Sequence, residues 1–418
     1  MAPRLWGLIF ILVTFASVQA KPKCTVQGDF QNDVICFAES SDYVLERGLV
    51  SDNNRTTRIV LKGCRIKDIN NDSFHSLPWL EYLDLSVNSI SNLEIGVFNG
   101  APQLTSLNLS YNLITVLPLG VFDHNLNIEL LDLRGNKIYI LEQGLFDPLK
   151  KLKHLDLSSN LLRGKQLSPY IFDALKHIQV IDFSRNDMSD TSDLLLNTFQ
   201  EVNVLNLDRC FLVHLPNFAL KTNLRTMKQL IISTNQLSKL ENSTAFVNLD
   251  SLEILNMADN KIDSIAGNIF VPLKKIKNII LRNNKLNSIP DNLFRDLPEL
   301  TNLDLSHNLI EFVPVNAFRG APLKNLNLSD NKFSYLTDNF CLELRNSGGK
   351  LKKIYFNDNP WQCACLFDFI AEVKRMGISY NTAKYNGQVK VCVMEQFSCQ
   401  RQQSMNDLYV ELYNNNLS

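Results

Sequence analysis

The chain has 418 residues, 45% of them hydrophobic, and its 42 Lys and Arg residues nearly balance its 43 Asp and Glu residues. A formal net charge of -1 creates no chain-wide field that would attract nucleic acid or an anionic membrane surface, so we expect neither as a partner. The 9 cysteines are an odd number, so at least one has no disulfide partner within the chain.

Residues 1–20 have the composition of a cleaved secretory signal peptide. Arg4 precedes an apolar run from Leu5 to Val13, and Val18 and Ala20 place small residues where signal peptidase needs them. The alternative is a membrane anchor, which requires about 20 consecutive apolar residues, more than this run contains. No later segment is long and apolar enough to span a bilayer, so we expect a secreted, extracellular protein without a membrane span.

Residues 21–55 are predicted to form an N-terminal cap. Cys24 and Cys36 bracket a short stretch ahead of the first repeat, which is consistent with a hairpin closed by one disulfide. Such a cap is needed because the first unit of a repeat array would otherwise expose an apolar face to water.

Residues 56–359 repeat one unit, which is clearest from Leu80 to Gly100. Leu83, Leu85 and Asn88 belong to the pattern LxxLxLxxNxL. The asparagine position recurs at Cys64, Asn88, Asn112, Asn136, Asn160, Asn186, Cys210, Asn235, Asn260, Asn284, Asn308, Asn331 and Asn359. Most of these 13 repeats are 24 residues long, and we expect the extra residues of the longer units, before Asn186 and Asn359, on the convex side.

The chemistry of each unit predicts a bent stack. The leucines of LxL point inward and the intervening residues outward, so successive strands build a parallel sheet, while the asparagine amide bonds to buried turn groups. A phenylalanine follows in most units, at Phe74, Phe98, Phe122, Phe146, Phe270, Phe294 and Phe318, with shifted members at Phe172, Phe199, Phe246 and Phe340. These rings widen the outer side. We therefore predict an α/β solenoid, a leucine-rich repeat horseshoe with a parallel concave β-sheet and disulfide-stapled end caps.

Residues 360–400 are predicted to form a C-terminal cap. After Trp361, an amphipathic run from Phe367 to Met376 ends at Gly377, which indicates a helix. The cysteines of this cap are Cys363, Cys365, Cys392 and Cys399. Residues 401–418 are expected to be a polar tail with too few apolar residues for a coiled coil. Removal of residues 403–418 should be tolerated.

The repeats resemble the typical class of extracellular leucine-rich repeats, and NPWxCxC at residues 359–365 with two later cysteines resembles their C-terminal cysteine-rich cap. Toll-type receptor ectodomains, Slit-like guidance proteins and small matrix proteoglycans share this layout. The chain is most similar to the secreted leucine-rich immune proteins of insects, in the short form without a coiled coil, although its front cap has two cysteines where many relatives have four. The resemblance implies a role in recognising microbes or in holding a defence protein in circulation.

Six cysteines belong to the caps, with Cys24–Cys36, Cys363–Cys392 and Cys365–Cys399 as the favoured pairs, although sequence does not fix connectivity. Cys64 and Cys210 lie six repeats apart, too far to bond, and are expected to be buried free thiols. Cys341 has two interpretations: a buried, unused thiol, or an intermolecular disulfide in a linked dimer. An extracellular location favours disulfides over zinc at the CxC, so we expect no metal and no cofactor.

Sequons for N-glycosylation stand at Asn54, Asn71, Asn108, Asn242, Asn327 and Asn416. Asn108 and Asn327 occupy the outward place between the leucines of LNLS, so glycans there would stand on the concave sheet and restrict a concave ligand to the middle repeats. The alternative is that these two sites are unmodified, because the repeat pattern itself tends to supply LNLS.

The middle of the concave face carries the candidate binding residues. The outward column reads Asp132, Asp156, Asp182, Asn206 and Ile231, and the residues we select on and beside it are Arg134, His154, Arg185, Arg209, Lys228 and Ile231. Mixed charge beside an apolar residue can bind a protein, and arginine is enriched in interfaces. The alternative is a strand face that is simply solvated. No histidine spacing, nucleophile motif or phosphate loop indicates an enzyme.

Two functions remain open, beside a purely structural role that is harder to test. The first is a secreted recognition protein of innate immunity that binds a protein or a microbial ligand. The second is an extracellular matrix or cell-surface signalling ligand in development or adhesion. Expression raised by infection would favour the first, and stable adhesion to uninfected cells would favour the second.

Overall fold

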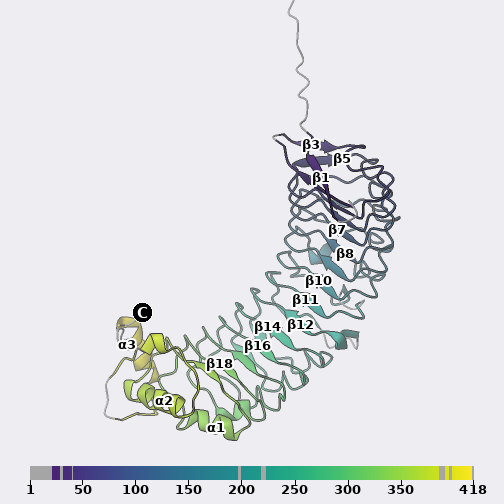
Figure 1. Ribbon diagram of the computed structural model, residues 1–418. Coiled ribbons are helices and arrows are strands. Elements are labelled where there is room, and N and C mark those ends of the chain that lie inside the picture. Colours follow the sequence, from purple (N-terminus) through teal and green to yellow (C-terminus); the bar gives the residue numbers. More distant parts are fainter. Residues whose placement is uncertain are drawn as a thin grey trace, which may run out of the picture.

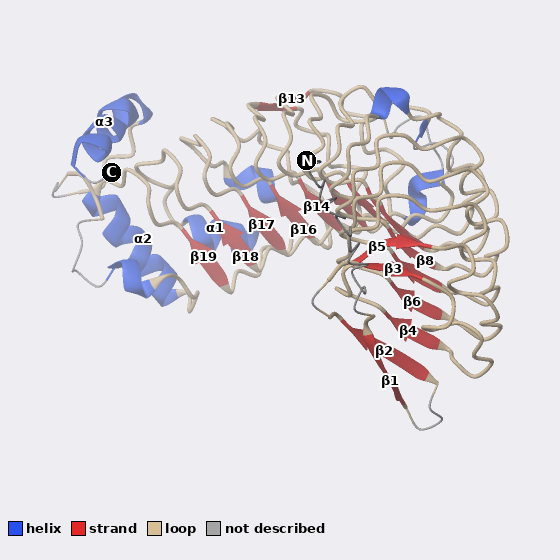
Figure 2. Ribbon diagram, turned by 90° about the horizontal axis from the view of Figure 1, so that it is seen from above, coloured by secondary structure: helices blue, strands red, loops and turns tan. Residues whose placement is uncertain are grey.

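The computed structural model describes residues 21–28, 32–39, 41–195, 199–217, 223–385, 391–394 and 398–416. The predicted signal peptide, residues 1–20, lies outside the described residues. The described chain forms a curved stack that is closed at each end by a disulfide-bonded cap (Figure 1). Within it, one 15-stranded sheet follows the inner side of the curve (Figure 2).

The sheet begins with an antiparallel pair and continues in parallel. Its order is β1 (Lys23–Gln27), β2 (Asp33–Phe37), β4 (Arg58–Val60), β6 (Tyr82–Asp84), β7 (Ser106–Asn108), β8 (Leu130–Asp132), β9 (His154–Asp156), β10 (Val180–Asp182), β11 (Val204–Asn206), β12 (Gln229–Ile231), β14 (Ile254–Asn256), β16 (Asn278–Ile280), β17 (Asn302–Asp304), β18 (Asn325–Asn327) and β19 (Lys353–Tyr355). The strands from β4 to β19 supply one strand per repeat, which confirms the predicted solenoid with its parallel concave sheet.

Short elements lie outside this sheet. Two small parallel pairs join β3 (Tyr43–Leu45) to β5 (Ile66–Ile69) and β13 (Lys239–Leu240) to β15 (Ser264–Ile265). The α-helices are α1 (Phe340–Asn346), α2 (Cys363–Arg375) and α3 (Asn406–Asn416), and the 3-10 turns are η1 (Gly164–Gln166), η4 (Asn223–Thr226), η5 (Val315–Phe318), η6 (Thr382–Tyr385) and η7 (Gln403–Met405).

The repeated asparagine connects each turn of the stack to its neighbours. Asn160 is buried, and its Nδ2 donates to the carbonyls of Leu133 and Leu157 at 3.0 Å and of Ser158 at 3.2 Å. Its Oδ1 accepts the backbone N–H of Ile138, in the preceding repeat, at 3.0 Å. One side chain therefore satisfies four backbone groups that burial would otherwise leave unpaired.

Cysteine replaces asparagine at two positions because its thiol keeps the donor role. Cys210 Sγ donates to the carbonyl of Phe183 at 3.3 Å, and Cys64 Sγ donates to the carbonyl of Cys36 at 3.2 Å. The missing acceptor is replaced by backbone, since the N–H of Met188 donates to the Cys210 carbonyl at 3.0 Å. Both cysteines are buried and free, as their burial in the repeat pattern indicated.

The predicted phenylalanine column forms the outer part of the core. Neighbouring rings such as Phe270, Phe294 and Phe318 stack with centroids 5.7 to 5.9 Å apart, and all three are buried. Strands on the inner side are closer, about 4.8 Å apart. The difference in spacing between the two sides produces the curvature.

The two long repeats place their extra residues differently. In the repeat before Asn359, α1 follows the phenylalanine column and lies on the outer side, as expected (Figure 1). In the repeat before Asn186 the expectation was wrong, because the extra residues form η1 directly after the strand and its turn. There the N–H of Gly164 donates to the carbonyl of Asp187 at 2.7 Å. A Cβ at residue 164 would lie 1.9 Å from Thr191 Oγ1, so this close approach requires glycine.

Both caps contain the disulfides that the sequence favoured: Cys24–Cys36, Cys363–Cys392 and Cys365–Cys399. In the C-terminal cap, the fully buried Trp361 donates from Nε1 to the carbonyl of Phe356 at 2.8 Å and stacks on Phe369 of α2. The last repeat is thereby shielded from water by an aromatic cluster.

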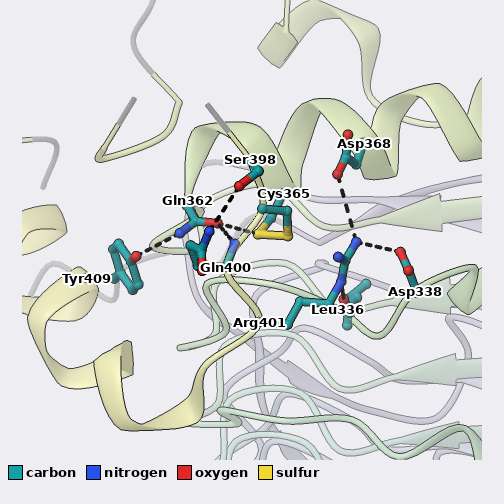
Figure 3. Close-up of a disulfide and its surroundings, with 10 residues drawn as sticks. Leu336, Asp338, Gln362, Cys365, Asp368, Ser398, Gln400, Arg401 and Tyr409 are labelled. Atoms are coloured by element: carbon teal, nitrogen blue, oxygen red, sulfur yellow. Dashed lines mark hydrogen bonds and ion pairs between the residues drawn. A yellow bond between two sulfur atoms is a disulfide. The ribbon is translucent and has the colours of Figure 1, made fainter. Parts of the chain in front are cut away.

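The end of the chain is more than the expected polar tail. Within it, α3 packs on the cap through Tyr409, which is 1% exposed and accepts a hydrogen bond from Gln362 Nε2 at 2.7 Å (Figure 3). Asn406 Nδ2 donates to the carbonyl of Lys332 at 2.8 Å, and Arg401 pairs with Asp338 at 2.7 Å. The polar composition of residues 401–418 gave no indication that Tyr409 is buried.

Cys341 is free and 2% exposed within α1, and burial raises the pKa of its thiol. The neighbouring Glu372 of α2 accepts the N–H of Leu342 at 3.0 Å and so holds α2 against the start of α1. A disulfide to a second chain would require this packing to open. The geometry therefore favours the buried, unused thiol over the linked dimer.

Asn160→Ala should lower the free energy of unfolding by about 3 kcal/mol, because it leaves several buried backbone groups unpaired. Asn160→Cys should cost about half of that, since a thiol can still donate as Cys210 does. Urea denaturation followed by circular dichroism measures both. Equal losses for the two variants would contradict this account of the cysteine positions.

Tyr409→Ala should detach α3, at a cost of about 3 to 5 kcal/mol for the lost aromatic packing. Hydrogen exchange of the backbone amides of residues 406–416 should then lose its protection. Tyr409→Phe, which keeps the ring and removes only the hydroxyl, should retain most of it. Unchanged protection in the alanine variant would restore the interpretation of this segment as a dispensable tail.

Candidate functional site

The last residue of most concave strands points outward and stabilises the end of its strand. In nine repeats its Asp or Asn accepts, through Oδ1, the backbone N–H two residues further on, at 2.7 to 3.2 Å. The residues are Asp84, Asn108, Asp132, Asp156, Asp182, Asn206, Asn256, Asp304 and Asn327. Most of this polar column therefore stabilises the strand ends, which leaves the arginines and apolar residues as the better indicators of binding.

Three acidic members of the column lie side by side on β8, β9 and β10. Burial, together with the neighbouring Asp156, raises the pKa of Asp132 from its usual value of 3.8 to about 6. Burial is also the main cause of the raised pKa of Asp182, whose Oδ2 accepts from Asn206 Nδ2 at 2.7 Å. Arg134 Nη2 lies 3.0 Å from Asp132 Oδ2, and its Nη1 lies 3.7 Å from Asp156 Oδ2. The guanidinium of Arg134 is thus used to offset this row of carboxylates.

The structure separates the remaining candidate residues. His154 and Lys228 are exposed at the sheet, and Ile231 lies half-buried on β12. Arg209 pairs with Asp208 at 3.4 Å. Arg185 lies in the turn after β10, at φ 59°, and lines a hollow at the edge of the sheet instead of the concave face. The six predicted residues do not form one site.

Exposed apolar side chains follow that edge through the first half of the stack. We call these residues the edge strip: Val87, Tyr111, Leu113, Tyr139, Leu161, Phe211 and Val213. Leu161 is 59% exposed and Phe211 is 56% exposed. A Cβ at Gly135 would lie 2.6 Å from the Tyr111 ring, so glycine is needed for the ring to lie across the turn. Large apolar side chains in water at successive turns indicate a contact surface.

A hollow of about 610 Å³ lies in the edge strip, and we call it the edge hollow. Its lining residues are Tyr139, Asn160, Leu161, Leu162, Arg163, Gln166, Arg185, Asn186, Asp187 and Phe211. Gln166 belongs to η1 and Arg163 directly precedes it, so the segment that contains the two extra residues of this repeat forms one wall of the hollow. The irregular repeat thus contributes one side of the edge hollow.

Positive charge dominates the edge hollow. Neither Arg163 nor Arg185 has an ion-pair partner among the residues that the structure describes. The one carboxylate, Asp187, already accepts from Ser189 Oγ at 2.7 Å. Two available guanidiniums beside exposed aromatic rings suit a partner that presents a carboxylate next to an apolar side chain.

Sequence reasoning missed Tyr139, Leu161, Phe211 and Arg163. A signal was present, because the residue after the repeated asparagine is expected to face water and is apolar at Leu113, Leu161 and Phe211. The wall formed by η1 could not have been predicted, since it depended on where in the repeat the extra residues fall.

The sequons are distributed over loops and strands. Asn54, Asn71 and Asn242 are exposed, and Asn108 and Asn327 lie half-buried on the concave strands β7 and β18. The side chain of Asn416 lies outside the described residues.

A family model for the leucine rich repeat matches residues 54–114, 102–162, 228–286 and 274–333. These segments together span just over half of the chain and omit residues 163–227. The omitted stretch supplies Arg163, Arg185, Asp187 and Phe211 of the edge hollow. No curated protein sequence matches the chain.

Several solved structures share the fold. A leucine-rich repeat protein of Leptospira interrogans has a TM-score of 0.63 and 22% identity, over 78% of this chain and 84% of that chain. Toll of Drosophila, in its complex with Spätzle, has a TM-score of 0.59 and 21% identity, over 83% of this chain and 56% of that chain. The APL1 leucine-rich repeat domain has a TM-score of 0.59 and 22% identity, over 80% of this chain and 82% of that chain. These likenesses establish a shared architecture.

The raised pKa of Asp132 has a consequence for stability. A carboxyl whose pKa is higher in the folded state stabilises the fold at low pH, and that contribution is lost as pH rises through about 6. Asp132→Asn keeps an oxygen that can accept the Arg134 N–H, and should therefore stabilise the protein at pH 8 by on the order of 1 kcal/mol. The advantage should disappear near pH 4.

Thermal denaturation at both pH values measures this effect. Asp304→Asn is a matched control, since Asp304 holds the same repeat position between Ile280 and Asn327, whereas Asp132 lies between Asn108 and the carboxylate of Asp156. A destabilised Asp132→Asn at pH 8 would contradict the unfavourable burial of this charge.

Proposed function

Because the chain belongs to the leucine-rich repeat family, we propose that it is a secreted recognition protein that binds an extracellular protein or a microbial ligand in innate immunity. The observation that carries the proposal is the edge hollow, where exposed aromatic residues meet two arginines that have no ion-pair partner within the described part of the chain. Binding is the whole of the proposed activity, with no catalytic step.

An extracellular location is supported by the three disulfides, which persist in oxidising compartments. The signal peptide predicted at residues 1–20 agrees with it. No helix among the described residues is long and apolar enough to cross a membrane.

The chemistry of the edge hollow favours a protein as the ligand. Tyrosine, phenylalanine and arginine are enriched where proteins meet, and a few such residues usually supply most of the binding energy. Phe211 and Leu161 offer apolar area, while Arg163 and Arg185 can each bond to a carboxylate. We propose that the partner inserts an apolar side chain flanked by an acidic residue.

The developmental alternative shares the same scaffold. The Toll–Spätzle complex is itself described as a hub in both Drosophila development and innate immunity, so likeness to it does not separate the two roles. The immune role is preferred because the repeats and the cysteine-rich C-terminal cap resemble those of the secreted leucine-rich immune proteins of insects. Abundance that rises on infection would favour the immune role, whereas stable adhesion to uninfected cells would favour the developmental role.

A capture experiment tests the site. Tagged mature protein is incubated with extracellular fluid from infected and uninfected animals of its source, and the captured proteins are identified by mass spectrometry. Phe211→Ala and Arg185→Glu should each reduce recovery of the main partner at least about tenfold, which is the loss typical of a central interface residue.

Two exposed residues outside the hollow serve as controls. Leu309→Ala removes an exposed leucine at the same repeat position as Leu161, and Arg319→Glu reverses an exposed arginine after the phenylalanine column. Both controls should bind normally. Equal capture by all four variants would exclude the edge hollow as the binding site.

A further inference from the structure

A second hollow, of about 250 Å³, lies on the concave sheet near its C-terminal end, and we call it the concave hollow. Strands β16 to β19 line it with Asn278, Ile279, Ile280, Asn302, Leu303, Asp304, Asn325, Leu326, Asn327 and Tyr355. Four asparagine amides, one carboxylate and one tyrosine meet here. One of the amides, Asn327, begins the sequon Asn-Leu-Ser.

Three of the amides form a ladder across adjacent strands. Asn302 Nδ2 donates to Asn278 Oδ1, and Asn325 Nδ2 donates to Asn302 Oδ1. Among the described residues, the ends of the ladder, Asn278 Nδ2 and Asn325 Oδ1, have no partner. Because each amide is fixed by its neighbour, the ladder presents one donor and one acceptor in set directions.

The side chain of Asn327 is oriented for modification. Its Oδ1 accepts from the N–H of Ser329 at 3.2 Å and from the Ser329 hydroxyl at 2.8 Å. Its Nδ2, the atom that carries an N-glycan, has no partner among the described residues. A sugar attached there would begin inside the concave hollow, directly between Asp304 and Tyr355 on the flanking strands.

The lining matches the chemistry of a pyranose. Sugar hydroxyls both donate and accept, so they can use the ladder ends and Asp304, whose Oδ1 is taken by Ser306 while its Oδ2 is unpartnered among the described residues. The C–H face of the ring can pack on Ile280 or Tyr355. Flanking strands are about 4.8 Å away, within reach of the first sugars.

We propose that the concave hollow is a saccharide-binding site and that its occupant is the N-glycan on Asn327. This inference rests on the secretion proposed above, because only a chain in the secretory pathway is glycosylated. The bound glycan covers the concave face from β16 to β19. A protein partner is thereby confined to the opposite half of the stack, where the edge hollow lies.

Asn108 provides a matched comparison site. It holds the same place in an identical Leu-Asn-Leu-Ser segment on β7, and its Oδ1 likewise accepts from the N–H two residues on, at 3.0 Å. Its neighbours in the column are Asp84 and Asp132. The residues beside the column on β6, β7 and β8 are Tyr82, Ser106 and Leu130, which provide no amide ladder.

The test uses the full chain, secreted from cells that leave N-glycans in the high-mannose form. An endoglycosidase that cuts between the two core N-acetylglucosamines is added to the native protein, and release at each site is followed by glycopeptide mass mapping. Release from Asn327 should be at least about tenfold slower than from Asn108, as expected if contacts worth about 1.4 kcal/mol hold the glycan. After denaturation the two rates should be equal.

Asn302→Ala, which breaks the ladder, and Asn278→Ala, which removes only its end, should each accelerate release from Asn327 and leave Asn108 unchanged. Circular dichroism verifies that both variants are folded. Equal native rates at the two sites would overturn the proposal, as would a chain that carries glycans elsewhere but none at Asn327. Secretion would stand in both cases, whereas a chain with no glycan at any sequon would overturn secretion as well.

Discussion

The hydrogen bonds of the repeated asparagine are the constraint on which the rest of the structure depends. Each inward-facing amide joins two consecutive turns, as Asn160 does by bonding within its own repeat and to the one before it. Without this amide, the turn after each strand would bury unpaired backbone groups, which is costly. The stack is therefore rigid along its length, and its surface residues are held at fixed spacings.

Much of this could be predicted from sequence because repetition makes the signal redundant. The buried leucines, the asparagine and the phenylalanine column each recur at a fixed offset, so a single irregular unit cannot hide the pattern. The caps were also predictable, because the apolar ends of a repeat stack must be covered and the clustered cysteines indicate disulfide-bonded segments at both ends. The departures were single events: η1 falls on the edge and not on the outer side, and Tyr409 anchors a segment of polar composition.

The candidate site was harder to predict, because it lies where the repetition is interrupted. Charges on the concave face attract attention in a sequence, yet nine of the Asp and Asn residues there stabilise strand ends, and Arg134 is paired with two of the carboxylates. The edge hollow arises where the pattern breaks, in residues 163–227 between the segments that match the family. The regular repeats predict the scaffold, whereas the hollow lies where the repeat departs from its usual length.

The backbone of the turns adds a final consequence. Val87, Tyr111, Arg185 and Arg209 all stand just before the repeated asparagine or its cysteine substitute, with φ between 53° and 59°. An L-residue pays roughly 1 to 2 kcal/mol to adopt this left-handed conformation, and the surrounding stack enforces it. Side chains at these positions are consequently displayed on main chain that is already ordered in the free protein. A partner that docks there loses little conformational entropy on their behalf, so a small contact area can yield useful affinity.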